Sequence, residues 1–263
     1  MNEALSKLIE ILSILRKECP WDKVQTHESL RICMLEEAYE VCEAIDNGNF
    51  TNLEEELGDV LLQVLFHSAL AAESAKFDLV SVIDKESEKL IRRHPHVFSK
   101  ENIKSVDKAI EKWENVKWKE KGDTSYSERL AMIPRALPAL MRSYKIQAKA
   151  GEAGFDWDDV SGAYHKIKEE TEELIEAGLE GDNGRISEEL GDLLFSIVNV
   201  ARFLDVNPEQ ALNATSERFI RRFAYIEREA ESQGRELTKM SLSEMDGLWE
   251  EAKLRERTDG LLK

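Results

Sequence analysis

The stretch LEEAYEVCEAIDNGNFTNLEEELGDVL, residues 35–61, decides the fold because it reads as two acidic helices joined by a turn. Glu37 and Glu40 are three positions apart, and so are Glu56 and Asp59. This spacing puts each pair of carboxylates on one face of a helix. The tripeptide Asn-Gly-Asn between the two clusters is a turn signal. We therefore predict a helical hairpin that brings the two pairs together.

The chain encodes the same hairpin a second time, 133 residues later. This single shift gives 12 identities over the 36 positions of residues 35–70, including the block EELGD at 55–59 and 188–192, so we infer an internal duplication. It places Glu36, Glu37, Glu40, Glu56 and Asp59 on Glu169, Glu170, Glu173, Glu189 and Asp192. Slightly different offsets pair Trp21-Asp22 with Trp157-Asp158, Ile91-Arg92-Arg93 with Ile220-Arg221-Arg222, and Trp113-Glu114 with Trp249-Glu250.

The fold class predicted for the whole chain is all-α. Only 13 glycines and 5 prolines occur, apolar residues recur with helical periodicity, and alternating strand patterns are missing. Helices are expected near 3–17, 28–47, 52–75, 79–92, 105–119, 138–150, 160–179, 184–204, 208–232 and 242–257. Capping-box patterns at Thr51/Glu54 and Ser241/Glu244 mark two helix starts. We expect an N-terminal domain over 1–118, a linker over 119–135 with connector-like composition, and a C-terminal domain over 136–263.

Composition limits the classes of function. A chain of 263 residues with 42% apolar residues is long enough for one or two cores, and its net charge of -17 argues against general binding of nucleic acid. No apolar run reaches the roughly 20 residues of a membrane helix, and the N-terminus lacks a secretory pattern, so we expect a cytoplasmic protein. Three cysteines without CxxC spacing indicate reduced thiols.

The acidic clusters have a plain interpretation, since a run of charge on a helix is usually a solvated face. Retention of all five carboxylates in register across the two copies instead favours a functional interpretation. Four converging carboxylates repel each other unless a cation compensates them, and all-oxygen ligation suits Mg²⁺ or Mn²⁺. Mg²⁺ commonly shares its shell with substrate phosphates, which directs attention to phosphate chemistry.

Histidine-containing metal sites are less favoured. A di-iron bundle requires Glu-x-x-His pairs, and none of the five histidines has a glutamate three positions earlier. His94 and His96 could ligate a metal, but a surface turn after a helix explains them more simply. Gly58 and Gly191 cost helix stability beside the carboxylates, and close approach of backbone or ligand would explain them.

Cationic and aromatic residues that could hold a phosphorylated ligand follow each acidic hairpin. Arg218 and Arg222 are four positions apart, as are Trp249 and Lys253, and the N-terminal equivalents are Lys89, Arg93, Trp113 and Lys117. Lys166, Arg185 and Asn199 stand where the N-terminal copy has Cys33, Asn52 and Phe66. His94-Pro95 should also end the N-terminal helix directly after Arg93. We therefore expect the C-terminal copy to be the main catalytic one.

Several short motifs carry a resemblance to a known family: CPWD at 19–22, EEAYE at 36–40, ELGD at 56–59, RRHPHVF at 92–98, GFDW at 154–157, EETEE at 169–173 and ELGD at 189–192. In these motifs the sequence resembles the MazG family of nucleoside triphosphate pyrophosphohydrolases. The resemblance spans essentially the whole chain. It implies two tandem four-helix domains, a homodimer, and Mg²⁺-dependent hydrolysis of nucleoside triphosphates to monophosphate and diphosphate with broad base tolerance.

The resemblance also implies site residues. Metal ligands would be Glu170, Glu173, Glu189 and Asp192, matched in the N-terminal copy by Glu37, Glu40, Glu56 and Asp59. Nucleotide contacts would include Lys166, Glu169, Arg185, Arg218, Arg222, Trp249 and Lys253, to which the comparison of the copies adds Asn199. Arg218 stands where lysine is common in the family, a change that should preserve phosphate binding.

The mechanistic hypothesis is attack of water on the α-phosphorus, activated by Mg²⁺ held in the C-terminal copy. Glu169 or Glu188 would orient or deprotonate that water. Two alternatives stay open: a narrow enzyme resembling all-α dUTPases, and a nucleotide-binding regulatory or stress-response module without significant turnover.

Overall fold

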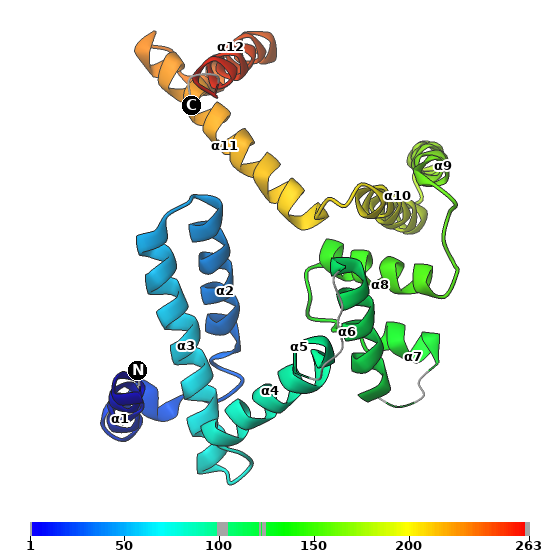
Figure 1. The fold of residues 1–263 in the computed structure, drawn as a ribbon. Helices are drawn as coiled ribbons and strands as arrows, with labels where there is room; N and C mark the ends of the chain where they lie inside the picture. The colour runs from blue at the N-terminus through cyan, green and yellow to red at the C-terminus, as the bar shows by residue number, and fades with distance from the viewer. Residues whose placement is uncertain (1, 99–104, 121, 123–124, 261–263) are drawn as a thin grey trace. The chain divides into compact units, whose positions relative to one another are not determined.

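The computed structural model describes residues 2–98, 105–120, 122 and 125–260. Within them every regular element is a helix, which confirms the predicted all-α class (Figure 1). The chain divides into two compact units, residues 1–122 and 123–263. The domain and linker bounds expected from composition stay a prediction. No helix in the described ranges combines the length and apolar character needed to cross a membrane.

The first unit is built around the hairpin of α2 and α3, which lie side by side (Figure 1). Its core joins Leu12, Leu30, Leu65 and Phe66, all at most 3% exposed. The unit contains α1 (Asn2–Glu18), the 3-10 helix η1 (Asp22–Val24), α2 (Arg31–Asp46), α3 (Phe50–Glu73), α4 (Leu79–Arg93), α5 (Pro95–Phe98) and α6 (Val106–Glu120).

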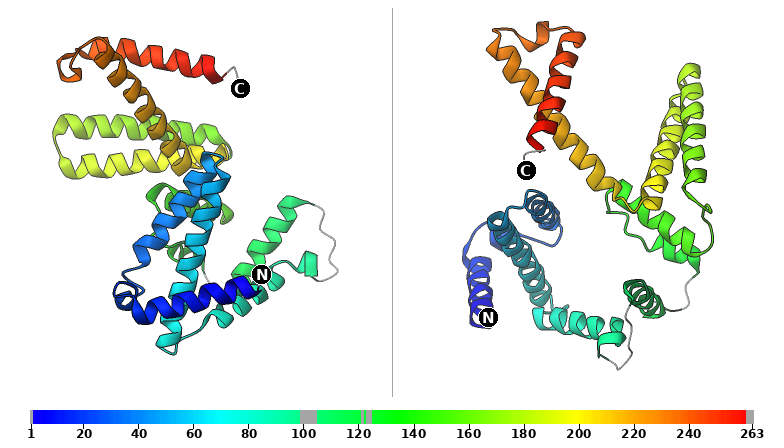
Figure 2. Two further views of the ribbon diagram at one scale, coloured as in Figure 1. Left: turned by 90° about the vertical axis from the view of Figure 1, so that its left-hand side faces the viewer. Right: turned by 45° about the horizontal axis from the view of Figure 1, so that its top comes forward.

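The second unit repeats this plan with the hairpin of α9 and α10, seen in Figure 2, and with a further pairing of α11 and α12. Ala163 and Ala177 on α9 are fully buried, and the Gln147 side chain anchors α8 by donating to the Phe195 carbonyl at 2.8 Å. The unit contains α7 (Tyr126–Ala131), α8 (Ala139–Glu152), α9 (Val160–Glu180), α10 (Asn183–Phe203), α11 (Pro208–Ser232), η2 (Leu237–Lys239) and α12 (Leu242–Gly260).

The two acidic hairpins turn in the same way. Gly48 and Gly181, related by the 133-residue shift, both have positive φ, 62° and 72°, a conformation that glycine adopts without a steric penalty. The next residue in each copy, Asn49 or Asp182, caps the following helix by accepting backbone N–H bonds. The turn chemistry therefore sets the register in which the carboxylates of the two helices meet.

Several local predictions are settled by these elements. The capping box at Ser241 and Glu244 is confirmed by reciprocal side-chain and backbone bonds. The one expected at Thr51 is wrong: α3 begins at Phe50, two residues earlier than predicted, because Asn49 is the cap and accepts from the Asn52 backbone. Helix α4 ends at Arg93 before His94, as predicted.

The segment expected to be a linker also holds structure of its own. Helix α7 lies inside it, started by a capping box at Ser125 and Glu128.

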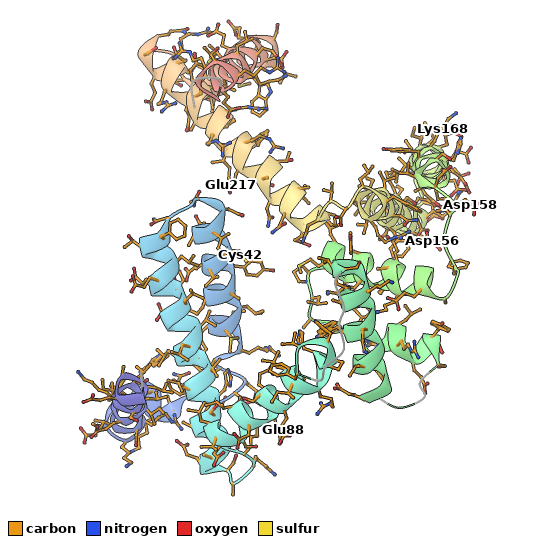
Figure 3. The ribbon with its side chains drawn as sticks, viewed as in Figure 1. Cys42, Glu88, Asp156, Asp158, Lys168 and Glu217 are labelled. Carbon is orange, nitrogen blue, oxygen red and sulfur yellow. The ribbon has the colours of Figure 1, made fainter. Side chains whose placement is uncertain are left out.

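The three cysteines are free thiols, and Cys42 lies exposed on α2 (Figure 3).

Candidate functional site

The C-terminal acidic cluster gathers its carboxylates around Glu170. Oxygens of Glu170, Glu189 and Asp192 lie within 4.8 Å of one another, and so do those of Glu169, Glu170 and Glu173. Glu170 is only 3% exposed, although it is acidic. The i, i+3 pairs of α9 and α10 therefore converge, as the spacing predicts.

Lys166 compensates part of this charge from within α9. Its Nζ lies 2.8 Å from Oε1 of Glu169 and 2.5 Å from Oε1 of Glu170. These two hydrogen bonds raise the pKa of Lys166, which secures its positive charge. Among the described residues no cation is paired with Glu173, and burial with repulsion from Glu170 and Glu189 raises its pKa.

Arg185 stands at the start of α10, beside the turn. It pairs with Glu180 at 2.5 Å and approaches Glu189 at 3.9 Å, and the negative charge of Glu180 raises its pKa. Arg185 thus lies next to a predicted metal ligand while its shortest bond goes to the end of α9.

The N-terminal cluster joins Glu37, Glu40 and Glu56, with ligand oxygens within 4.8 Å. Burial, followed by a hydrogen bond that protonated Glu37 donates to Glu40, raises the pKa of Glu37, and burial with repulsion from Glu40 raises that of Glu56. Asp59 adds to both repulsions. Among residues 2–98, no lysine or arginine is paired with this cluster.

The residues that replace Lys166 and Arg185 in the N-terminal copy explain its lack of internal cations. Cys33 packs against the hydrophobic core instead of reaching the carboxylates. Asn52 supplies a neutral bond, from Nδ2 to Glu56 at 3.3 Å. The two copies therefore carry equivalent carboxylates but differ in the positive charge that compensates them.

Both clusters consist of closely spaced carboxylate oxygens, and the pKa values of Glu37, Glu56 and Glu173 are raised, so this donor set is consistent with a metal site. Mutual repulsion of this kind is relieved by a hard divalent cation. The chemistry of the residues therefore fits a metal site, and the identity of the ion stays a prediction.

The C-terminal cationic residues are assembled on a different hairpin, that of α11 and α12. Arg222 stacks over the Trp249 ring, with its guanidinium carbon 5.4 Å from the ring centroid, and binds Glu256 at 2.7 Å. Arg218 donates to Thr215 at 2.6 Å, and Lys253 pairs with Glu250 at 2.7 Å. In the first unit Arg93 lies 5.5 Å over Trp113, Lys89 pairs with Glu86, and the side chain of Lys117 lies outside the described residues.

The structure therefore divides the predicted C-terminal site into two sets. Among the described residues, no hydrogen bond, ion pair or ring contact joins the carboxylates of α9 and α10 to Arg218, Arg222, Trp249 or Lys253. Asn199 accepts two bonds from Arg202, at 2.9 and 3.1 Å, so its amide oxygen faces its own helix. Glu188 is exposed and has no hydrogen-bonding partner in the described part of the chain.

Sequence reasoning missed two groups of residues. Glu256 and its N-terminal counterpart Glu120 bind the arginines. Both lie seven positions after a tryptophan, a shared spacing that marks them as a repeated pair but does not identify their partners. The second group is the ion pair of Arg202 with Asp156, at 2.5 Å; Asp156 lies in the loop before α9 and is labelled in Figure 3. At Gly58 and Gly191 an added Cβ meets no atom within 4 Å, so close packing within the described chain does not explain these glycines.

Comparison with known proteins identifies the family to which the sequence is similar. The model of the MazG nucleotide pyrophosphohydrolase domain matches residues 25–98 and 148–226. A nucleoside triphosphate pyrophosphohydrolase/pyrophosphatase of Thermotoga maritima is 45% identical over 96% of this chain and 98% of its own. A nucleoside triphosphate pyrophosphohydrolase of Escherichia coli K12 is 39% identical over 97% and 99%.

A solved structure is also similar in part. The crystal structure of a MazG-related protein from Thermotoga maritima is 35% identical, with a TM-score of 0.39, and covers 43% of this chain and 98% of that one.

Proposed function

This chain belongs to the MazG family of nucleotide pyrophosphohydrolases, and we propose that it is a Mg²⁺-dependent nucleoside triphosphate pyrophosphohydrolase that converts NTP and water into NMP and diphosphate. The observation that carries the proposal is that carboxylate oxygens of Glu189 and Asp192 converge on Glu170, which is buried. Such a donor set holds a divalent cation while leaving part of its shell to phosphate oxygens.

The C-terminal cluster is the proposed catalytic centre. Glu170, Glu173, Glu189 and Asp192 would hold Mg²⁺, and the bound ion would draw charge from the α-phosphoryl group and acidify an adjacent water. Lys166 and Arg185, which lie within the cluster, would offset negative charge that gathers on the phosphates. The N-terminal cluster, Glu37, Glu40, Glu56 and Asp59, is proposed to bind metal with weak or no turnover because it lacks both cations.

Proton transfer is assigned to the glutamates beside the ligands. The water oxygen forms a bond to the α-phosphorus, the bond from that phosphorus to its bridging oxygen breaks, and diphosphate leaves. Glu188 or Glu169 takes the proton of the water. Glu188 has no described partner, whereas Glu169 is held by Lys166 at 2.8 Å, which makes Glu188 the more available base.

The α11 and α12 hairpin supplies the proposed contacts to the nucleotide. Arg218, Arg222 and Lys253 offer guanidinium and ammonium groups to the polyphosphate, and Trp249 offers a flat surface to the base. Stacking does not read the hydrogen-bonding edge of a base and therefore tolerates different bases. We accordingly propose broad base specificity that includes ATP and extends to dNTPs or abnormal NTPs.

The protein is proposed to act as a homodimer. The chain exposes 19013 Å², whereas two separate compact domains of about 15 kDa expose about 14,000 Å² together. The surplus of about 5,000 Å² per chain means that the single chain leaves helix faces uncovered, which a partner would bury. Leu190, Leu194 and Ile197 form one exposed apolar stripe on α10, and a second copy of the chain is the proposed partner that covers it.

Product analysis of the full chain tests the proposal. The protein is incubated with Mg²⁺ and each of a panel of ribo- and deoxyribonucleoside triphosphates, and the products are identified by ion-exchange chromatography and phosphorus NMR. NMP with diphosphate from several bases is expected. NDP with phosphate would contradict the site of cleavage.

The alternatives predict different product patterns. Turnover of a single base would support the narrow dUTPase-like enzyme, and binding without any product would support the regulatory module. In ¹⁸O-labelled water the label should enter the monophosphate, because the attack is at the α-phosphorus.

A further inference from the structure

One arrangement of arginine, glutamate and tryptophan occurs in both units with the same atoms. In the second unit, Nε and Nη2 of Arg222 donate to Oε2 of Glu256 at 2.8 and 2.7 Å. In the first unit, Nε and Nη2 of Arg93 donate to Oε2 of Glu120 at 3.0 and 2.6 Å. Each glutamate thus receives one edge of one guanidinium on a single oxygen.

The other oxygen of each glutamate faces the preceding arginine. Nε of Arg92 lies 2.5 Å from Oε1 of Glu120, and Nε of Arg221 lies 3.7 Å from Oε1 of Glu256. Hydrogen bonds from Arg93 and Arg92 lower the pKa of Glu120 to about 2, which keeps it ionised. The glutamate therefore stands as a fixed anion between two neighbouring arginines.

A tryptophan fixes the plane of the second arginine. Arg222 and Arg93 lie 5.4 and 5.5 Å over the centroids of Trp249 and Trp113. Because tryptophan and glutamate are seven residues apart in both copies, two helical turns separate them on one face of α12 or α6. Ring and carboxylate together leave the guanidinium little freedom to rotate.

The arginine is well packed, and the outer edge of its guanidinium has no partner among the described residues. The side chain of Arg222 is 20% exposed, and among the described residues no hydrogen bond or ion pair engages its Nη1. A guanidinium has five N–H groups in a rigid fork, and Glu256 uses those of Nε and one of Nη2. The remaining edge has the geometry that grips two phosphate oxygens.

We infer that Glu256 is a positioning residue, which holds Arg222 against Trp249 so that the free guanidinium edge meets the polyphosphate of the substrate. The inference rests on the proposed function, since it requires Arg222 to contact nucleotide. Glu120 holds Arg93 in the same way in the first unit, where the neighbouring cluster lacks the cations of the catalytic copy. Orienting the side chain in advance lowers the entropic cost of binding.

The opposite effect of Glu256 is also chemically reasonable and gives the inference a sharp test. A carboxylate on a phosphate-binding arginine could instead act as a competing anion that the substrate must displace. Its removal would then tighten substrate binding, whereas removal of a positioning residue weakens it. The direction of the change in affinity separates the two.

The experiment compares Glu256→Ala, Glu256→Gln and Glu120→Ala in the full chain. We measure kcat and KM for ATP, and the Kd of a non-hydrolysable triphosphate analogue by calorimetry. Glu256→Ala should raise KM and Kd about tenfold, the loss of one charge-assisted bond, while kcat changes less. Glu256→Gln should restore part of the affinity because its amide oxygen still accepts from Arg222, and Glu120→Ala should leave both constants near those of the native chain.

A double-mutant cycle with Arg222→Ala completes the test. If Glu256 acts through Arg222, adding Glu256→Ala to Arg222→Ala should weaken analogue binding no further. A fall in Kd on removing Glu256, an unchanged Kd, an equal effect of Glu120→Ala, or additive losses in the cycle would each overturn the inference. Absence of turnover in the native chain would instead refute the proposed function, and the calorimetric constants would still decide the role of Glu256.

Discussion

Nζ of Lys166 lies 2.5 Å from Oε1 of Glu170, so the buried carboxylate at the centre of the C-terminal cluster is paired with a cation one turn before it on α9. In the other copy the corresponding residue is Cys33, which packs into the core. Because of this difference, we expect the two clusters to depend on a metal ion to different degrees.

Lys166→Ala should make the second unit depend on divalent cations for stability. The change leaves Glu170 buried without its partner, which should cost about 1–3 kcal/mol in metal-free buffer. Mg²⁺ should restore most of the loss, as measured by urea unfolding with and without the ion. Lys168→Ala is the matched control, because Lys168 is exposed on the same helix (Figure 3) and pairs only weakly, at 3.9 Å, with Glu172.

Glu189→Gln should abolish turnover without changing helix content. The substitution keeps the shape of the side chain but removes one charged ligand of the cluster, so activity should fall at least about 100-fold. Circular dichroism measures the helix content, and a diphosphate-release assay measures the turnover. Glu56→Gln, the equivalent change in the first unit, should retain most of the activity; a loss as large as that of Glu189→Gln would show that the first unit carries the chemistry.

Two glycine substitutions should change stability in opposite directions. Gly191→Ala adds a Cβ in open space within α10 and should stabilise it by about 1 kcal/mol. Gly162→Ala places a Cβ 2.7 Å from the Trp157 ring and should cost about 1–3 kcal/mol. Chemical denaturation measures both, and a loss of stability in Gly191→Ala would indicate that a ligand or second chain packs there.

Acid should remove the stabilising effect of Glu244. Bonds from the Ser241 backbone and from Arg235 lower its pKa from 4.5 to about 2. A group with a lowered folded-state pKa stabilises the fold fully above its unfolded pKa and loses that effect as pH falls through the folded value. Glu244→Gln should therefore be less stable than the native chain at pH 7, and the difference should shrink between about pH 4.5 and 2 in urea titrations. A difference that is constant with pH would mean that the charge is irrelevant.

Leu194→Asp should dissociate the proposed dimer. It introduces a charge into the apolar stripe on α10, where Leu194 is 45% exposed in the single chain. Sedimentation equilibrium should show dimers for the native chain and mainly monomers for the variant, with little change in helix content. Glu217→Gln, on α11 (Figure 3), serves as a control outside the stripe. A monomeric native chain would refute this part of the proposal.

Much of the candidate site is readable from the sequence because it depends on spacing within single helices. Residues three or four positions apart share a helix face whatever the rest of the fold does. That rule predicts the pairs Glu37/Glu40 and Glu170/Glu173, and the hairpin turn predicted after each pair accounts for the approach of Glu56 and Glu189 from the next helix. The preference of Asn49 over Thr51 as a cap was not readable, because both residue types favour that position.

The sequence by itself determined the helical class, the duplication and the convergence of the carboxylates, because periodicity, turn residues and i, i+3 spacing act over a few residues. Only the tertiary structure decided that Glu256 meets Arg222, 34 positions away, while Trp249 closes over the same guanidinium. It also separated the contacts of the α9 and α10 hairpin from those of α11 and α12. Local spacing fixes which face a side chain occupies, but the partner of that face depends on how whole helices pack.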